Sequence, residues 1–398
     1  MTVIYLDNNA TTKVDPAVLE AMLPYLTELY GNPSSMHSFG GQVGKALKEA
    51  REQVATLFGA EEASEIVFTS CGTEGNNTAI RAALAAQPDR RHIITTQVEH
   101  PCVLNVCKQL EKQGYRVTYL SVDRQGMLDL MELEAALTGD TALVTIMYAN
   151  NETGVVFPIE TIGAIAKGYG ATVHVDAVQV AGKLPLNMKT STVDMMTISG
   201  HKLHAPKGVG ALYIRKGFRF RPLLLGGHQE RGRRAGTENV PGIIGLGKAA
   251  EIASFELKYT GREQRLRDRL EQTILTTIPN TEVNGHPKNR LPNTTNIGFK
   301  YIEGEAILLM LNKHGICASS GSACTSGSLE PSHVLRAMGL PYTILHGSIR
   351  FSLSRFTTDA EIDRVLDVLP GIVENLRAIS PFNSDEADWL QGREEVLV

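Results

Sequence analysis

Between residues 64 and 215 the chain alternates short β-rich runs with stretches of helical pattern. Because strands and helices follow one another in turn, the pattern predicts an α/β fold with a mostly parallel sheet covered on both faces. Ligands in such folds lie at the carboxyl ends of the strands. The predicted strands are 65–69, 92–96, 115–121, 143–149, 172–176, 195–198 and 211–214, and the predicted helices are 74–86, 101–113 and 159–169.

A second region begins near residue 250. It contains predicted helices 262–275, 305–314 and 359–378, predicted strands 294–299 and 348–352, and a Ser/Gly loop over 319–328. We therefore predict an N-terminal segment and large domain over residues 1–250, a smaller α+β domain over 251–380, and a polar tail over 381–398.

The peptide Ser-Gly-His-Lys-Leu-His-Ala-Pro-Lys-Gly-Val-Gly, residues 199–210, places Lys202 in a turn after a predicted strand. A lysine held there is pre-positioned and partly desolvated, as the amine of a Schiff base requires. Pyridoxal 5′-phosphate (PLP) is the cofactor that most often uses such a lysine, together with an acidic partner for its ring nitrogen. Taken alone, the peptide also fits a surface hairpin with a solvated lysine.

A phosphate site is predicted where residues 70–74, Ser-Cys-Gly-Thr-Glu, join a strand to a helix. Gly72 lets the backbone approach an anion, Thr73 offers its N–H and hydroxyl groups, and the helix dipole favours negative charge. Ser199 and His201 can add two donors to the same phosphate. Any strand-to-helix turn can carry Gly-Thr, so the motif is weak by itself.

The residues predicted to hold the cofactor ring also follow strands. Asp176 ends a buried strand, where a protonated ring nitrogen would keep its carboxylate ionised, and Gln179 can bond the ring hydroxyl. His100, before Pro101, can stack on the ring and move protons near neutral pH. The alternatives are a structural Asp that caps a turn and a capped loop at His-Pro; His174 is interpreted as a core or supporting histidine.

Two further residues suit a substrate carboxylate. Asn151 follows a strand and can offer its amide to that carboxylate or to the ring hydroxyl. Arg350 lies within an apolar strand, where a buried guanidinium requires a carboxylate partner. That partner is either the substrate or an internal acidic residue, and the sequence leaves both open.

Cys324 lies in the small-residue loop 319–328, unlike the setting of a core cysteine. An accessible thiol there suits a nucleophile, although an incidental cysteine in a linker is the alternative. The chain has no Cys-x-x-Cys pair, so neither a closed zinc site nor a thioredoxin-like motif is indicated. The other cysteines are interpreted as small core residues: Cys71, Cys102, Cys107 and Cys317.

Taken together these segments resemble the cysteine desulfurases of the class-V aminotransferase family, from about residue 3 to 380. The motifs that carry the resemblance are residues 7–12 (Asp-Asn-Asn-Ala-Thr-Thr), 31–37, 199–210, 232–239 and 322–324. The long cysteine loop, 318–333, resembles that of the first group of the family. Residues 226–234 and 341–343 are most similar to its nitrogen-fixation (NifS-like) branch.

The resemblance implies a PLP-dependent fold-type-I homodimer with active sites at the subunit interface. It implies that Lys202 forms the Schiff base with PLP and that His100 stacks on the ring. Asp176 would pair with the ring nitrogen and Gln179 with the ring hydroxyl, while Asn151 and Arg350 would bind the carboxylate side of the substrate. The residues implied to bind the phosphate are Gly72, Thr73, Ser199, His201 and Thr237 of the partner subunit.

The implied reaction converts L-cysteine to L-alanine. Lys202 moves the α-proton, and the thiolate of Cys324 attacks the substrate sulfur and keeps it as a persulfide, with His100 as the candidate base for the thiol. The resemblance further implies transfer of this sulfur to an iron–sulfur scaffold protein, supply of nitrogenase clusters, and transient ligation of a cluster by Cys324.

Bulk properties exclude other classes. The net charge is −4, so nothing indicates a nucleic-acid or anionic-membrane partner. No apolar run approaches the roughly 20 residues of a membrane span, and the start lacks a signal peptide's pattern, which predicts a cytoplasmic protein.

Three alternatives remain at this stage. Another PLP-dependent aminotransferase or β-eliminating lyase would use Lys202, Asp176 and Arg350 but has no use for Cys324 on a loop. A selenocysteine lyase would use the whole set. A sulfur- or iron-carrying scaffold that has kept the fold would need no PLP, and the complete set of site residues argues against it.

Overall fold

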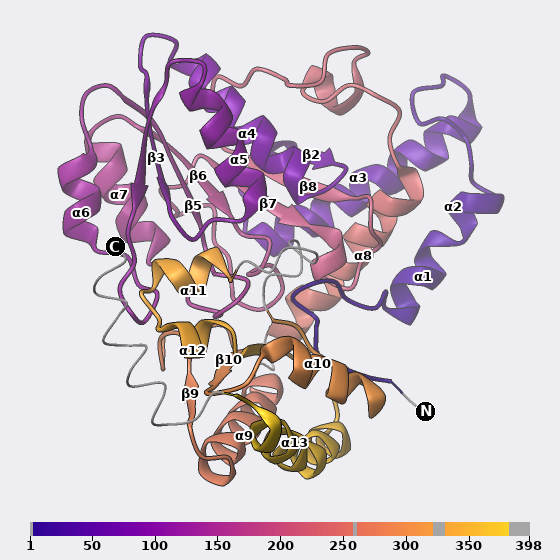
Figure 1. The fold of residues 1–398 in the computed structure, drawn as a ribbon. Helices are drawn as coiled ribbons and strands as arrows, with labels where there is room; N and C mark the ends of the chain where they lie inside the picture. Colours follow the sequence, from indigo (N-terminus) through magenta and orange to yellow (C-terminus); the bar gives the residue numbers. More distant parts are fainter. Residues whose placement is uncertain (1–2, 258–260, 321–330, 382–398) are drawn as a thin grey trace.

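The structure is a computed structural model and describes residues 3–257, 261–320 and 331–381 (Figure 1). Its central sheet is built from β2 (Ile66–Thr69), β3 (His92–Thr96), β4 (Arg116–Leu120), β5 (Thr141–Met147), β6 (Thr172–Asp176), β7 (Met195–Ser199) and β8 (Gly210–Ile214). The strand order is β2-β8-β7-β6-β5-β3-β4. β8 is antiparallel to both of its neighbours, and the other pairs are parallel. The predicted α/β fold with a mostly parallel sheet is therefore confirmed.

Helices cover the central sheet on both faces (Figure 1). One face packs against α4 (Gly72–Ala86) and α5 (Pro101–Glu111), which share a core with Val67, Ile93 and Leu212. The other face packs against α3 (Ser38–Phe58), α6 (Leu130–Ala136), α7 (Ile159–Gly168) and α8 (Val240–Glu256). Because strands between two layers bury both faces, β5, β6 and β7 are buried along their whole length.

The C-terminal part has its own sheet and core. β9 (Thr281–Val283), β10 (Thr294–Phe299) and β12 (Ser348–Ser352) pair antiparallel in the order β12-β10-β9. This core also takes side chains from α9 (Arg262–Thr277), α10 (Gly304–Lys313) and α13 (Asp359–Ile379). The short helices α11 (His333–Ala337) and α12 (Tyr342–Leu345) pack instead against the core of the central sheet.

The N-terminal segment reaches this second core. β1 (Ile4–Tyr5) pairs parallel with β11 (Ile316–Cys317), and Leu6 is buried among the C-terminal side chains. After residue 15 the chain enters α1 (Pro16–Met22) and α2 (Pro24–Thr27), and α1 packs on α8. The start of the chain thus contributes to both cores. The predicted domain boundaries, at residues 250 and 380, stay a prediction.

Most predicted element bounds agree with the structure to within two residues. Strand 143–149 is displaced by two residues at both ends, since β5 runs from Thr141 to Met147. Its first residue pairs with His92, and its end is followed by a turn in which Ala149 bridges Val156. After Met147, Tyr148 is half-buried and Ala149 is buried.

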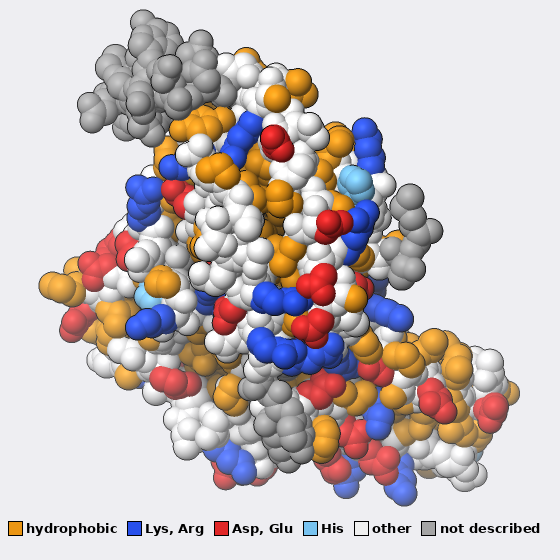
Figure 2. Space-filling view, turned by 90° about the horizontal axis from the view of Figure 1, so that it is seen from below, with side chains coloured by type: hydrophobic (Ala, Val, Ile, Leu, Met, Phe, Trp, Pro, Cys, Tyr) orange, Lys and Arg blue, Asp and Glu red, His pale blue; other side chains and the backbone are white. Residues whose placement is uncertain are grey.

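Basic and acidic side chains lie interspersed on the face seen from below (Figure 2). Ion pairs of Arg265 and Arg269 with Asp359 and of Arg269 with Asp363 join α9 to α13. Such exposed pairs stabilise a fold only weakly. No helix in the described ranges is long and apolar enough to cross a membrane.

A buried ion pair between α3 and the turn η3 (Gln229–Gly232) gives a stability prediction. Arg51 holds both carboxylate oxygens of Glu230, at 2.6 and 2.7 Å, and the Glu230 side chain is 3% exposed. Arg51→Ala leaves this carboxylate buried and unpaired, so we expect a loss of about 3–5 kcal/mol in the free energy of unfolding.

The matched control lies on the same helix. Lys45 pairs with Glu49 at 3.9 Å, and its side chain is 80% exposed. Lys45→Ala should change the free energy of unfolding by no more than about 0.5 kcal/mol. Denaturant unfolding of both variants measures the difference, and equal losses would contradict the prediction.

Candidate active site

Most of the predicted site residues line one cavity of about 360 Å³. It lies where β5, β6 and β7 end and where α4 and α5 begin. The predicted residues that line it are Gly72, Thr73, His100, Asn151, Asp176, Gln179, Ser199, His201, Lys202 and Arg350. A second cavity, of about 500 Å³, lies beside Arg124 and Arg290 and contains none of them.

The end of this cavity near α4 has the properties of an anion site. Ser199 Oγ is buried and has no hydrogen-bond partner among the described residues. A Cβ on Gly72 would stand 2.9 Å from Val178 Cγ2 and 3.9 Å from Ser199 Oγ, so glycine is what permits this close approach. The side chain of Cys71 does not cap α4. A helix N-terminus beside a buried hydroxyl donor fits the phosphate of PLP.

Asp176 is held by neutral donors. Its Oδ2 accepts from Asn76 Nδ2 at 2.6 Å, and its Oδ1 accepts from the Val178 N–H at 3.0 Å. Asn76 reaches it because α4 lies tight against β7: a Cβ on Gly75 would stand 2.5 Å from Thr197 Cγ2. Neutral donors orient a carboxylate without cancelling its charge, so Asp176 suits a protonated ring nitrogen.

Lys202 is the last residue of the short 3₁₀ helix η2 (Gly200–Lys202), and its side chain contacts the N-terminal segment. Its amine donates to the carbonyl oxygens of Asn9 and Ala10, the latter at 2.7 Å. The carbonyl oxygen of Asn9 also accepts from Gln179 Nε2 at 3.0 Å. The lysine and the glutamine therefore share one acceptor.

The histidines around Lys202 are neutral near pH 7, because their pKa values are lowered. Burial and the charge of Lys202 lower the pKa of His201 to about 4. Burial also lowers the pKa of His100, against the opposing charge of Asp176. His100 Nδ1 accepts the N–H of Cys102 at 3.2 Å, which helps to fix the orientation of the ring. The histidine in β6, His174, is a core residue between Thr145 and Thr197, as interpreted from its strand position.

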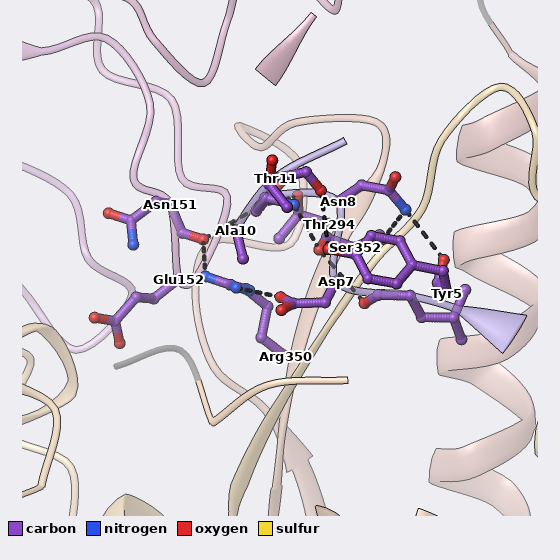
Figure 3. Close-up of polar contacts among 12 residues, drawn as sticks. Tyr5, Asp7, Asn8, Ala10, Thr11, Asn151, Glu152, Thr294, Arg350 and Ser352 are labelled. Atoms are coloured by element: carbon purple, nitrogen blue, oxygen red, sulfur yellow. Dashed lines mark hydrogen bonds and ion pairs between the residues drawn. The ribbon is translucent and has the colours of Figure 1, made fainter. Parts of the chain in front are cut away.

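Arg350 lines the same cavity and lies between the N-terminal segment and the turn after β5 (Figure 3). Its Nη2 donates to Asp7 Oδ1 at 2.6 Å and its Nη1 to the Asn151 carbonyl oxygen at 3.0 Å. Its Nε is buried without a partner among the described residues. The internal salt bridge that the sequence left open is therefore present, and one donor of the guanidinium is still to be satisfied.

Two predicted residues are not in this cavity as described. Thr237 lines a separate cavity of about 90 Å³ with Arg234 and Glu230. Cys324 lies outside the described residues, and so does its predicted role as a cluster ligand. Within residues 3–257, 261–320 and 331–381, no group of three or more His, Cys, Asp or Glu side chains could hold a metal ion.

Sequence reasoning missed several lining residues. Asn76 lies four residues after Gly72, one helical turn away on the same face, and this spacing could have indicated it. Asn9 and Ala10 belong to a motif that was noted without a role. Cys71 and Cys102 were interpreted as core residues but line the cavity. Burial raises the pKa of Cys102 to about 12, so it stays a neutral thiol.

The chain belongs to the class-V aminotransferase family, whose family model matches residues 4–365. Members of that family use PLP, and the cavity described above fits this cofactor.

The similarities to named proteins are more specific. The chain is 79% identical to cysteine desulfurase 2 of Trichormus variabilis over the whole of both chains. It is 61% identical to the cysteine desulfurase NifS of Azotobacter vinelandii, covering 96% of this chain and 95% of that one. A solved structure of a NifS-like protein superimposes with a TM-score of 0.88 at 41% identity, covering 94% of this chain and all of the other. The chain is thus a PLP-dependent cysteine desulfurase, and the alternative lyases are not favoured.

Glu99, next to His100, gives a pH prediction. Its Oε1 accepts from Thr96 Oγ1 at 2.8 Å and from the Met147 N–H at 2.9 Å. Burial raises the pKa of Glu99 to about 8, whereas glutamate in an unfolded chain titrates near 4.3. Between these two values the folded protein holds a proton that the unfolded chain releases. Glu99 therefore lowers the stability as the pH rises from about 4 to 8, by up to about 1.4 kcal/mol per unit.

Glu99→Gln keeps a neutral side chain at every pH and should flatten this dependence. Denaturant unfolding of both proteins between pH 5 and 8 measures the slope. Parallel slopes for the wild type and the variant would contradict the prediction.

Proposed function

We propose that the cavity binds PLP through Lys202 and takes sulfur from L-cysteine with Cys324 as the acceptor. The observation that carries this proposal is the convergence in one cavity of a lysine, a buried aspartate, an unsatisfied hydroxyl at a helix N-terminus and a buried arginine. Bound there, PLP supplies an electron sink that weakens the bonds around the α-carbon of the amino acid.

In this proposal, different residues bind the phosphate and the ring of the cofactor. Gly72, Thr73, Ser199 and His201 bind the phosphate, and Asp176 pairs with the ring nitrogen. Asn76 holds Asp176 in place by a hydrogen bond of 2.6 Å. His100 stacks on the ring, and Gln179 donates to the ring hydroxyl. The 360 Å³ cavity has room for the cofactor and a small amino acid.

The substrate carboxylate binds beside Arg350 and the amide of Asn151. The unpartnered Arg350 Nε supports this assignment, because a buried guanidinium N–H seeks an anionic oxygen. Asp7 and the Asn151 carbonyl oxygen fix the plane of the guanidinium. The α-carbon of the amino acid is thereby directed toward Lys202.

Lys202 then moves the α-proton, and the thiolate of Cys324 attacks the sulfur of the substrate. The carbon–sulfur bond breaks, a sulfur–sulfur bond forms, and the carbon skeleton leaves as L-alanine. An ordinary thiol titrates near 8.5, so Cys324 must lose its proton to a neighbour. His100, which lines the same cavity, is our candidate to take that proton.

We further propose that the enzyme acts as a cytoplasmic homodimer. Thr237 lies away from the cavity of its own chain, which supports a role in the partner's site. Apolar side chains exposed on one protomer support a covered interface: Leu23, Leu26, Tyr30 and Leu225. Given the NifS-like relatives, the sulfur passes to an iron–sulfur scaffold protein, with nitrogenase clusters as the proposed destination. A transient cluster ligand at Cys324 belongs to the same proposal.

The test of the reaction is product analysis. Purified enzyme with L-cysteine and a reductant should yield alanine and sulfide in equal amounts. Sulfide with pyruvate and no alanine would mean β-elimination and would remove Cys324 from the reaction.

Cys324→Ala tests whether Cys324 accepts the sulfur of the substrate. It should lower sulfide release by at least about a thousandfold, because a reaction loses its covalent route with its nucleophile. The bound PLP absorbance should be unchanged, since Cys324 does not hold the cofactor. Cys107→Ala is the control, because Cys107 is buried in the core and should leave sulfide release near the wild-type value. Sulfide release by Cys324→Ala at the wild-type rate would contradict the assignment of Cys324 as the sulfur acceptor.

A further inference from the structure

Lys183 approaches the site from behind Gln179. Its Nζ donates to the backbone oxygen of Gln179 at 3.0 Å and to Gln179 Oε1 at 3.3 Å. At the other end of the same amide, Gln179 Nε2 donates to the Asn9 carbonyl oxygen at 3.0 Å. The oxygen of an amide accepts hydrogen bonds and its nitrogen donates them. Here Gln179 Oε1 has a donor as its partner and Nε2 has an acceptor. The orientation of the Gln179 amide is therefore fixed from both sides.

Lys183 also lies close to the reactive lysine. Both line a cavity of about 40 Å³ behind the site. Burial lowers the pKa of Lys183 to about 7, helped by the charge of Lys202 and opposed by Glu263. The other charged or titratable groups around it are Arg350, Glu256, Arg355 and His204. A lysine amine carries N–H groups in both protonation states, so the contact to Oε1 is available on either side of neutral pH.

We propose that Lys183 is a positioning residue that holds Gln179 so that an N–H, and not an oxygen, faces the ring oxygen of PLP. The inference rests on the proposed function, in which Gln179 bonds that oxygen. With Oε1 held by Lys183 and one Nε2 hydrogen held by Asn9, the second Nε2 hydrogen is directed into the cavity that Gln179 lines. A donor there stabilises the anionic form of the ring oxygen.

Lys183→Met tests this role by the absorbance of bound PLP as a function of pH. Loss of the donor makes the ring oxygen more basic, so the pH midpoint of the absorbance change should rise by about one unit. Lys183→Arg retains donors and should restore most of the wild-type midpoint. Lys189→Met is the matched control, since Lys189 is exposed nearby and its loss should leave the midpoint unchanged. An unchanged midpoint in Lys183→Met overturns the proposal.

A double variant separates positioning from a direct effect of charge on Lys202. In the Gln179→Leu background, Lys183→Met should add less than about a third of its single-variant shift, because the residue it orients is gone. A full additional shift would overturn the positioning role. If Lys183→Met does not fold, Lys183→Leu, which also lacks a donor, gives the same comparison.

The proposed function has its own readout. Borohydride should attach PLP covalently to the wild-type chain and not to Lys202→Ala, because only the Schiff base of Lys202 can be reduced to a stable bond. If this holds while Lys183→Met leaves the midpoint unchanged, only the inference about Lys183 fails. If Lys202→Ala is labelled as well as the wild type, the proposed function itself fails.

Discussion

The buried guanidinium of Arg350 is the constraint on which the rest of the site depends. It lies in β12, its side chain is 1% exposed, and a charge so placed must be matched by partners. Asp7 supplies the opposite charge from the N-terminal segment, and Asn151 supplies a carbonyl oxygen from the turn after β5. One side chain thereby joins the start of the chain, the central sheet and the C-terminal sheet around a single cavity.

Much of the fold could be predicted because its elements have strong local patterns. Strands β3, β6, β10 and β12 were predicted with their observed bounds, since each is a short run of β-formers between turn signals. The site could be predicted because polar residues lie at strand ends. Asp176 and Ser199 are polar residues at the ends of apolar strands. Such residues are costly to bury without a partner, so their presence indicated a ligand.

The contacts that hold these residues could not be predicted, because they join distant parts of the chain. Asn76 is 100 residues from Asp176, and the carbonyl oxygens that bind Lys202 come from Asn9 and Ala10. A backbone oxygen has no signature in a sequence, and an asparagine on a helix has many possible neighbours. Lys183 was overlooked for the same reason, since a lysine after a Gly is ordinary in a turn.

The tie between the two ends of the chain has a consequence for biosynthesis. Asn8 and Asn9 dock on Ser352, while the same segment binds Lys202. At about 5–20 residues per second, a nascent chain waits roughly 20 to 70 s between the emergence of Asn9 and that of Ser352. Until then this segment has its contacts to Gln179 and His201 but lacks those to Ser352. The complete cavity, with Arg350 in its lining, therefore exists only in a chain that has been made to its last strand.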